Sequence, residues 1–135
     1  MKVSVITVCL NSEPTIEHCI NSVLSQDYPD IEHLLIDGGS TDNTLAIIDQ
    51  YSSRIKQLVS EKDGGIYHAI NKGLKLESGE IIAILNSDDF YTDDQVISRV
   101  VEKFTTSNAD AVYGDLHYVD KEDQSKVIRD WVSGQ

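Results

Sequence analysis

The fold of this chain is decided by the stretch Ile81-Ile82-Ala83-Ile84-Leu85-Asn86-Ser87-Asp88-Asp89-Phe90. Its first half is an apolar run rich in isoleucine, typical of a strand that is covered on both faces in the parallel sheet of an α/β protein. The run ends abruptly at two carboxylates, Asp88 and Asp89, beside the Asn86 amide and the Ser87 hydroxyl. Because ligands of open α/β sheets bind outside the carboxyl ends of the strands, these side chains are predicted to line a binding site.

The paired carboxylates predict a metal site. Two neighbouring carboxylates repel each other unless a positive charge lies between them, and a hard divalent cation with oxygen ligands is the usual solution. We therefore expect Asp88 and Asp89 to hold Mg²⁺ or Mn²⁺. The alternative is an acidic loop that only solvates the strand end and caps the next helix. Other motifs of the chain favour the metal, because they point to the same place.

Length and charge narrow the class of protein. A chain of 135 residues predicts a single domain, residues 1–135. The formal net charge of −12, from 23 acidic and 11 basic residues, argues against nucleic acid or an anionic membrane as the main partner. No apolar stretch is long enough to span a bilayer, and Met1-Lys2 leads directly into a strand pattern instead of a signal peptide. We expect a cytoplasmic protein in which Cys9 and Cys19 are buried, reduced thiols.

Strand and helix patterns alternate along the chain. Apolar runs predict strands at 3–10, 31–36, 55–59, 81–85 and 109–113, and helical spacing predicts helices around 16–24, 45–51, 66–74 and 96–104. Asn11 or Ser12 is expected to cap the first helix, with Pro14 in its first turn. Residues 116–131 alternate weakly and suggest a hairpin.

This alternation predicts right-handed crossovers and a largely parallel sheet. If the strand order is 3-2-1-4, the ends of strands one, two and four lie side by side. Residues 7–11, 37–40 and 86–89 would then share one crevice, which is a nucleotide-binding geometry.

The motifs resemble those of the family 2 glycosyltransferases, inverting enzymes with the GT-A fold. The resemblance covers nearly the whole chain in the expected order, and its residues are Val3–Val8, Asn11, Ile36–Asp42, Asp63–Tyr67, Asn71–Gly73 and Leu85–Asp89. It implies a Rossmann-like, α/β nucleotide-diphospho-sugar transferase fold, with a mostly parallel sheet flanked by helices. The chain looks most like bacterial members that build polysaccharides such as capsule, O-antigen or exopolysaccharide.

The sequence departs from the family pattern at two positions. The metal motif is usually Asp-x-Asp, and Asn86 stands at its first position here. The resemblance still implies that Asp88 is the metal ligand, with Asp89 supporting it or reaching the ribose. His68 stands where relatives often have aspartate, which leaves the role of that position open.

The implied activity is metal-assisted hexosyl transfer with inversion, from a nucleotide-diphospho-sugar to a saccharide or lipid-linked acceptor. A UDP-sugar is the favoured donor. In the family the general base lies further along, in an acceptor-binding half beyond Gln135, so the resemblance implies the donor-binding portion of a longer protein or a truncated one. Asp115 is the one carboxylate of this chain that we nominate near an acceptor. A longer protein could associate peripherally with the inner face of the membrane, and homo-oligomerisation is left open.

The resemblance also assigns candidate nucleotide contacts on the first half of the chain. Asp37 is expected to accept the N3–H of a uracil ring, and the alternative is an aspartate that only shapes a turn. Thr7 and Asn11 would line the base and ribose, although Asn11 can equally cap a helix. Glu13 matches an acid that contacts the ribose or orders its loop, but a glutamate favoured by the helix dipole explains it as well.

The remaining candidates follow strands three and four. Lys62 would neutralise a phosphate or approach the base, with a solvated loop lysine as the alternative. Asn71 would hold the donor sugar or brace the metal loop, whereas Lys72 is expected to be a solvated helix residue. Asn86, Ser87 and Asp89 complete the predicted nucleotide site.

Three rival interpretations compete with this one. A receiver-type phosphoacceptor domain needs an acidic pair after its first strand, where this chain has Thr-Val-Cys-Leu-Asn. A dinucleotide-binding oxidoreductase needs Gly-x-Gly-x-x-Gly there, which is also missing. A non-catalytic module that binds a nucleotide sugar, or an inactive truncated fragment, stays open. The sequence leaves the base, the sugar and the acceptor unidentified.

Overall fold

The computed structural model describes residues 1–132, and the chain packs into two compact units. The first unit comprises residues 1–101 and the second begins at residue 102. The single domain expected from the length stays a prediction.

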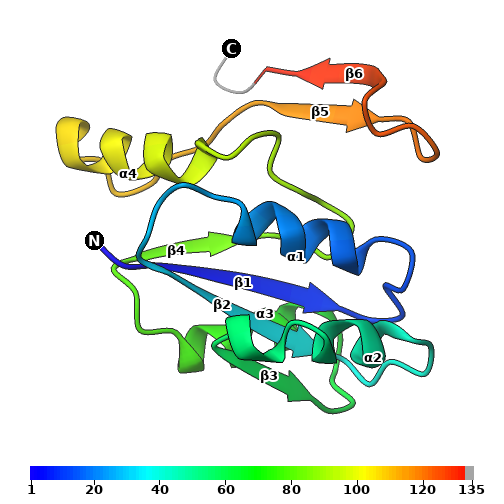
Figure 1. The fold of residues 1–135 in the computed structure, drawn as a ribbon. Coiled ribbons are helices and arrows are strands. Elements are labelled where there is room, and N and C mark those ends of the chain that lie inside the picture. Colours follow the sequence, from blue (N-terminus) through cyan, green and yellow to red (C-terminus); the bar gives the residue numbers. More distant parts are fainter. Residues whose placement is uncertain (133–135) are drawn as a thin grey trace. The chain divides into compact units, whose positions relative to one another are not determined.

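A four-stranded parallel sheet forms the centre of the first unit, in the order β3-β2-β1-β4 (Figure 1). β1 pairs with β2 from Val3 opposite Ile31 onward and with β4 from Val3 opposite Ile81 onward. The predicted order is therefore confirmed, and the carboxyl ends of β1, β2 and β4 meet at one edge. The strands are β1 (Val3–Cys9), β2 (Ile31–Asp37), β3 (Gln57–Ser60) and β4 (Ile81–Ile84).

Helices cover both faces of this sheet, with α1 (Ile16–Leu24) and α2 (Thr44–Asp49) on one face and α3 (Ile66–Leu76) on the other (Figure 1). Because side chains alternate along a strand, β1 and β2 feed two separate cores. One core, on the α3 face, contains Ile6, Val8, Leu34, Ile36 and Ala69. The other, on the α1 and α2 face, contains Cys9, Ile16, Ile20, Leu35 and Ile48.

The structure corrects the prediction that the isoleucine-rich strand is covered on both faces. Ile81 is 4% exposed, but Ile82 and Ile84 are 43% and 45% exposed. Within the described residues β4 pairs only with β1, so it is one of the two edge strands of this sheet. The fully buried strand is β1, whose seven residues all lie inside. An apolar run of this length does not distinguish a strand at the edge of a sheet from one at its centre.

The first helix also begins without the predicted cap. Neither Asn11 nor Ser12 caps α1 with its side chain, and Thr15 is the residue at the N-cap position. Instead the backbone carbonyl of Ser12 accepts hydrogen bonds from the amides of Thr15 and Ile16. Residues 10–15 thus form a loop at the carboxyl edge of the sheet, which leaves Asn11 and Ser12 free to contact neighbouring loops.

The second unit contains an antiparallel hairpin, as predicted, formed by β5 (Leu116–Val119) and β6 (Val127–Trp131). The helix α4 (Val96–Ser107) precedes it and begins within the first unit. The strand predicted at 109–113 is wrong, because this segment has no strand partner in the described chain and is largely exposed. Across residues 1–132, no helix is both long and apolar enough to cross a membrane. Cys9 and Cys19 are buried and free, as expected.

Candidate functional site

The predicted site residues gather in the loops at the carboxyl edge of the sheet. The loop after β2 is tied to the last residue of β1 by a hydrogen bond from the Gly38 amide to the Cys9 carbonyl, at 2.9 Å. The residue after β4 is tied to β1 by the Leu85 amide, which donates to the Ile6 carbonyl at 2.9 Å. This edge includes two turns: residues 37–42, called the Asp37 turn, and residues 86–89, called the acidic turn.

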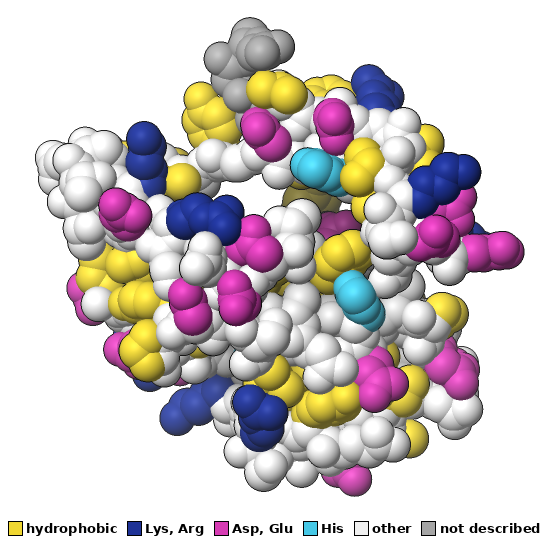
Figure 2. Space-filling model, turned by 45° about the horizontal axis from the view of Figure 1, so that its top comes forward, with side chains coloured by type: hydrophobic (Ala, Val, Ile, Leu, Met, Phe, Trp, Pro, Cys, Tyr) yellow, Lys and Arg dark blue, Asp and Glu magenta, His cyan; other side chains and the backbone are white. Residues whose placement is uncertain are grey.

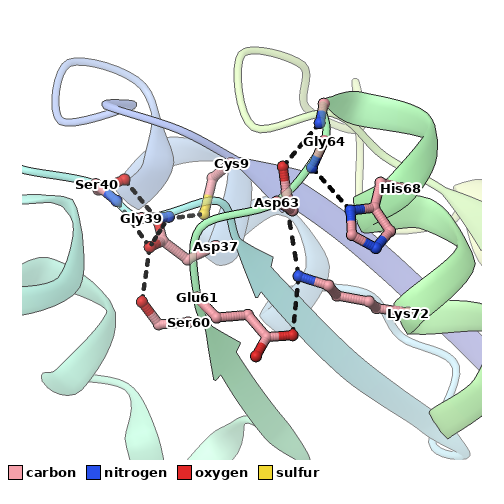
Figure 3. Close-up of polar contacts among 11 residues, drawn as sticks. Cys9, Asp37, Gly39, Ser40, Ser60, Glu61, Asp63, Gly64, His68 and Lys72 are labelled. Carbon is pink, nitrogen blue, oxygen red and sulfur yellow. Dashed lines mark hydrogen bonds and ion pairs between the residues drawn. The ribbon is translucent and has the colours of Figure 1, made fainter.

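Asp37 lies at the centre of its turn and is fully buried. Its Oδ1 accepts from the Ser40 hydroxyl at 2.5 Å and from the Cys9 thiol at 3.5 Å. Its Oδ2 accepts from the amides of Gly39 and Ser40, both at 3.0 Å, and from the Ser60 hydroxyl at 2.8 Å (Figure 3). Burial by itself raises the pKa of this carboxyl, but the hydrogen bonds from Ser40, Ser60 and Gly39 outweigh it and hold the pKa below its ordinary value.

This geometry favours the alternative stated for Asp37, an aspartate that shapes its own turn. A carboxylate offers about four acceptor positions, and five donors already occupy the two oxygens of Asp37. Gly39 adopts a φ of +95°, a conformation that suits glycine, and this brings two successive amides onto Oδ2. The Asp37 turn is thus fixed before any ligand binds.

Asn11 extends this network across to the loop after β1. It adopts a left-handed φ of 49°, which asparagine tolerates better than most residues. Its Oδ1 accepts from the Thr41 amide at 2.8 Å, and its own amide donates to the Ser40 hydroxyl at 2.8 Å. Glu13 supports the same region, because its Oε1 accepts from the Asn43 side chain at 2.8 Å. The loop-ordering role considered for Glu13 therefore matches its contacts.

Thr7 is a correction to the predicted site. Its side chain is fully buried in the middle of β1, and its hydroxyl lies 2.8 Å from Nε2 of His33. Since strand residues alternate between faces, Thr7 points into the core under α1 and does not line the edge where a ligand would bind. The buried His33 ring has its pKa lowered to about 4, because burial disfavours the charged form.

Two hydrogen bonds hold the acidic turn against the loop after β1 and against α1. The Ser87 hydroxyl lies 2.7 Å from the Ser12 hydroxyl, in a buried contact between the loops after β4 and β1. The Cys19 thiol of α1 donates to the Asn86 carbonyl at 3.5 Å. Ser12 in turn donates its amide to the Thr44 hydroxyl at 2.8 Å. The Ser87 hydroxyl is thus part of the support of this turn, whereas it was expected at the ligand.

In the acidic turn the two carboxylates repel each other, and one amide oxygen lacks a hydrogen-bond donor among the described residues. Asp88 and Asp89 are exposed, and the pKa of Asp89 is raised above its ordinary value, first by partial loss of water and then by the charge of Asp88. Oδ1 of Asn86 is buried and has no hydrogen-bond partner among residues 1–132. A divalent cation would relieve both conditions, because it neutralises the carboxylate repulsion and accepts an amide oxygen as a ligand. The residues present therefore fit such an ion.

These protein groups supply only part of a coordination shell. Nowhere in the described range do three His, Cys, Asp or Glu side chains group together as a metal site. Ca²⁺ and Mg²⁺ sites take about six or more ligands, so the remaining ones would come from water or a bound molecule. Acidic side chains are spread over the visible face of the protein, with basic ones between them (Figure 2). Because the chain carries a formal net charge of −12, a cation bound at the acidic turn would favour the approach of an anionic ligand.

The loop between β3 and α3 brings further charged groups to the same edge. Lys72 was expected to be solvated, but its side chain is only 15% exposed and its Nζ lies 2.9 Å from Oε1 of Glu61 and 3.9 Å from Oδ2 of Asp63 (Figure 3). That expectation is wrong because α3 packs against the sheet and turns Lys72 toward this loop. Lys62 is exposed beside them, and its backbone lies under Gly39.

The N-terminus of α3 is shaped by its two glycines. Gly65 has a φ of 116°, and its amide donates to Oδ1 of Asp63 at 3.0 Å. The Gly64 amide donates to Nδ1 of His68 at 2.7 Å, so this ring carries its proton on Nε2 when neutral. This contact gives His68 a structural role that the sequence left open. Asn71 lies exposed on α3.

Asp115, the nominated base, lies in the second unit between α4 and β5. Sequence reasoning missed three side chains that shape the edge: Asp63, Ser12 and Thr44. Asp63 could have been noticed from Gly38, since a glycine at the end of a strand leaves room for a side chain from elsewhere. Ser12 and Thr44 carry no local signal, because their roles arise from contacts between distant loops.

Comparisons with known proteins agree with this geometry. The family model described as Glycosyl transferase family 2 matches residues 4–132. The chain is 32% identical over 136 residues to the glycosyltransferase GlyG of Streptococcus pneumoniae serotype 4, covering 98% of this chain and 44% of GlyG. It thus spans less than half of the length of that relative.

Solved structures give the same result. S. aureus TarS 1–349 in complex with UDP-GlcNAc superposes with a TM-score of 0.74 at 30% identity, covering 82% of this chain and 33% of TarS. The mannosyltransferase PcManGT from Pyrobaculum calidifontis, in complex with GDP-Man and Mn²⁺, gives a TM-score of 0.73 at 28% identity and covers 87% of this chain and 35% of its own. The α/β fold with a parallel sheet flanked by helices is therefore that of these glycosyltransferases.

Proposed function

Because this chain belongs to glycosyl transferase family 2, we propose that it binds a nucleotide-diphospho-sugar at the carboxyl edge of its sheet and transfers the sugar to an acceptor hydroxyl. The observation that carries the proposal is the meeting of two unlike turns at this edge. The Asp37 turn is rigid and saturated with hydrogen bonds, whereas the acidic turn presents two carboxylates and an unpartnered amide oxygen within the described chain. Such an edge suits a ligand with a planar base at one end and a diphosphate at the other.

The acidic turn would hold a divalent cation, Mg²⁺ or Mn²⁺. Asp88 and Asp89 would be its protein ligands, and Asn86 would turn its orphaned Oδ1 toward it. When bound, the cation supplies Lewis-acid stabilisation of the negative charge that develops on the departing diphosphate. The Mn²⁺ complex of PcManGT supports this assignment for a related protein.

The rest of the chemistry concerns the acceptor. In an inverting transfer the acceptor hydroxyl attacks the anomeric carbon opposite the diphosphate, the bond from carbon to the diphosphate oxygen breaks, and the hydroxyl proton passes to a carboxylate base. We nominate Asp115 for that base within this chain. The nucleotide contacts in the proposal come from Asn11, Lys62 and Asn71 around the base, ribose and sugar.

UDP is the favoured nucleotide in this proposal, since TarS binds UDP-GlcNAc and is among the related structures. The acceptor would be a saccharide or lipid-linked saccharide of polysaccharide biosynthesis, which places the protein in the cytoplasm near the membrane. These points rest on the resemblance of the motifs and on charge, and each of them can be tested separately.

The first test is calorimetric titration of UDP, GDP and TDP into the protein, with Mn²⁺, with Mg²⁺ and with EDTA. We expect UDP to bind with a metal ion and at least tenfold more weakly in EDTA. No binding of any nucleotide would contradict the proposal. Release of UDP from UDP-sugars in the presence of saccharide acceptors then separates an enzyme from the rival, a module that binds nucleotide sugars without catalysis.

A further inference from the structure

Base recognition needs an acceptor with spare capacity, and Asp37 has none. Its two oxygens already accept from five donors of the protein, and the side chain is fully buried. A nucleobase N–H could reach it only by displacing one of these hydrogen bonds. Displacing a donor from a buried carboxylate leaves that donor unsatisfied, which cancels the gain.

The Asp63 carboxylate lies beside Gly38, a position that has no side chain of its own. Gly38 directly follows Asp37, and a Cβ built on Gly38 would lie 3.3 Å from both carboxylate oxygens of Asp63. The Asp63 carboxylate therefore occupies the space next to position 38 at the end of β2. Figure 3 shows Asp63 between the Asp37 turn and α3.

The Asp63 carboxylate is also held in place by its neighbours. Lys72 Nζ lies 3.9 Å from Oδ2, and the Gly65 amide donates to Oδ1 at 3.0 Å. A cation on one side and an amide donor on the other fix the orientation of the carboxylate. Oδ2 nevertheless accepts no hydrogen bond in the part of the chain that the structure describes, although the side chain is only 7% exposed. A buried carboxylate oxygen without a donor is costly in the free protein, and a ligand N–H would satisfy it.

We propose that Asp63 is the specificity-determining residue for the base, accepting the N3–H of a uracil or thymine ring. This inference rests on the proposed nucleotide site and deepens it. The single unsatisfied oxygen of this carboxylate matches the single imide N–H of these bases. Cytosine presents a lone pair at the same ring position and would face the carboxylate with like polarity.

The experiment compares the affinities of UDP and CDP for the wild-type protein and for Asp63→Asn, by calorimetry with Mn²⁺. The wild type is expected to prefer UDP at least tenfold. The amide introduced by D63N keeps an oxygen for the Gly65 N–H but offers its own N–H to the base, so the UDP to CDP ratio should fall at least tenfold. An unchanged ratio in D63N overturns the proposal, as does a wild type without preference.

Two controls separate Asp63 from its surroundings. Glu61 is the other acidic partner of Lys72, and the Glu61 side chain is 59% exposed. Glu61→Gln should therefore leave the ratio of UDP to CDP affinity unchanged. Asp37→Asn should lower the melting temperature and leave the ratio of the folded protein unchanged. A ratio lost in D37N and kept in D63N would assign base recognition to Asp37 instead.

A measurement on the wild type keeps the inference testable if D63N does not fold. The diphosphate of 3-methyluridine lacks the N3–H and should bind at least tenfold more weakly than UDP. Equal affinities would overturn the role of Asp63. Failure of every nucleotide to bind would be a different result, because it would remove the proposed function itself.

Discussion

The Asp37 turn and the acidic turn lie at the same edge of one sheet but differ in how far the protein satisfies them. In the Asp37 turn one carboxylate receives five donors, and its pKa is lowered. In the acidic turn the pKa of Asp89 is raised, and the amide oxygen of Asn86 lacks a partner among the residues described. The protein itself supplies the hydrogen-bond donors of the Asp37 turn, whereas the unpartnered groups of the acidic turn would be satisfied by bound ligands.

The largest effect is expected from breaking the Asp37 turn. Asp37→Ala leaves the Gly39 and Ser40 amides and the Ser60 hydroxyl without their acceptor in a buried place. The free energy of unfolding should fall by about 3 kcal/mol, measured by urea denaturation. Asp49→Ala, on the exposed surface of α2, is the matched control and should change it by less than about 0.5 kcal/mol. Equal losses of stability in Asp37→Ala and Asp49→Ala would show that the hydrogen bonds of Asp37 do not stabilise the fold.

Acid should weaken the same region through His33, which lies on the same face of β2 as Asp37. Its pKa is lowered to about 4 in the folded protein, below the value near 6.5 of the unfolded chain. The neutral ring therefore stabilises the fold above pH 6.5, and this stability is lost as the pH falls from 6.5 toward 4. The loss should amount to roughly 3 kcal/mol.

Urea denaturation at several pH values measures this dependence, with His33→Gln as the comparison. The variant should unfold more easily at about pH 7 but show a shallower decline between pH 6.5 and pH 4. Parallel declines in both proteins would assign the acid sensitivity to other groups. Glu32 acts at lower pH, because burial raises its pKa but hydrogen bonds from Ser4 and Ser78 outweigh the burial and hold the pKa at about 2. Its contribution is lost only between about pH 4.5 and pH 2.

Loss of a carboxylate from the acidic turn should affect ligand affinity and leave stability nearly unchanged, in contrast to Asp37→Ala. Asp88→Asn removes charge from an exposed and repelling pair, so the free energy of unfolding should change by less than about 0.5 kcal/mol. Metal-dependent affinity for UDP should fall about a hundredfold, since a carboxylate ligand of the cation is lost. Urea denaturation measures the first value, and calorimetry with Mn²⁺ and with EDTA measures the second. A variant with undiminished metal dependence would show that Asp88 is not a ligand.

The smallest effect concerns the contact that joins the two regions. Ser12 bridges them, because its hydroxyl meets Ser87 at 2.7 Å and its amide meets Thr44 at 2.8 Å. The Thr44 hydroxyl in turn donates to Asp42 of the Asp37 turn. Ser12→Ala and Ser87→Ala should each cost about 1 kcal/mol of stability, and the double variant should cost less than their sum. Additive costs in the double-mutant cycle would show that the two hydroxyls do not interact.

Sequence reasoning predicted the fold because hydrophobic period and turn residues report local structure. The alternation of strands and helices identified β1, β2 and the helices that cover them, and the glycines marked the turns after β2 and β3. It failed for β4, where an apolar run has the same pattern on an edge as in the centre, and for 109–113, where a short run found no partner strand in the described chain.

The candidate site was predicted in position but not in detail. The acidic turn follows directly from adjacent residues, so Asp88 and Asp89 were visible. Asp37 was visible as well, but its saturation depends on Ser60 from another strand. The one sequence signal for Asp63 is indirect: Gly38 at the end of β2 leaves room for a side chain, but the sequence does not say which residue fills that room. Thr7 was misplaced because its neighbourhood is set by the pairing of β1 with β2.

The central position of β1 has a consequence for how the chain folds. The ribosome makes β1 first, yet its hydrogen bonding is complete only when β4 has been made, since Val3 pairs with both Ile31 and Ile81. Contacts between distant residues form slowly, and chains fold from the N-terminus during synthesis. β1, α1 and β2 would therefore assemble as an early intermediate with one open side, and docking of β4 would be the slow step. Amide hydrogen exchange in β1 should accordingly require global unfolding.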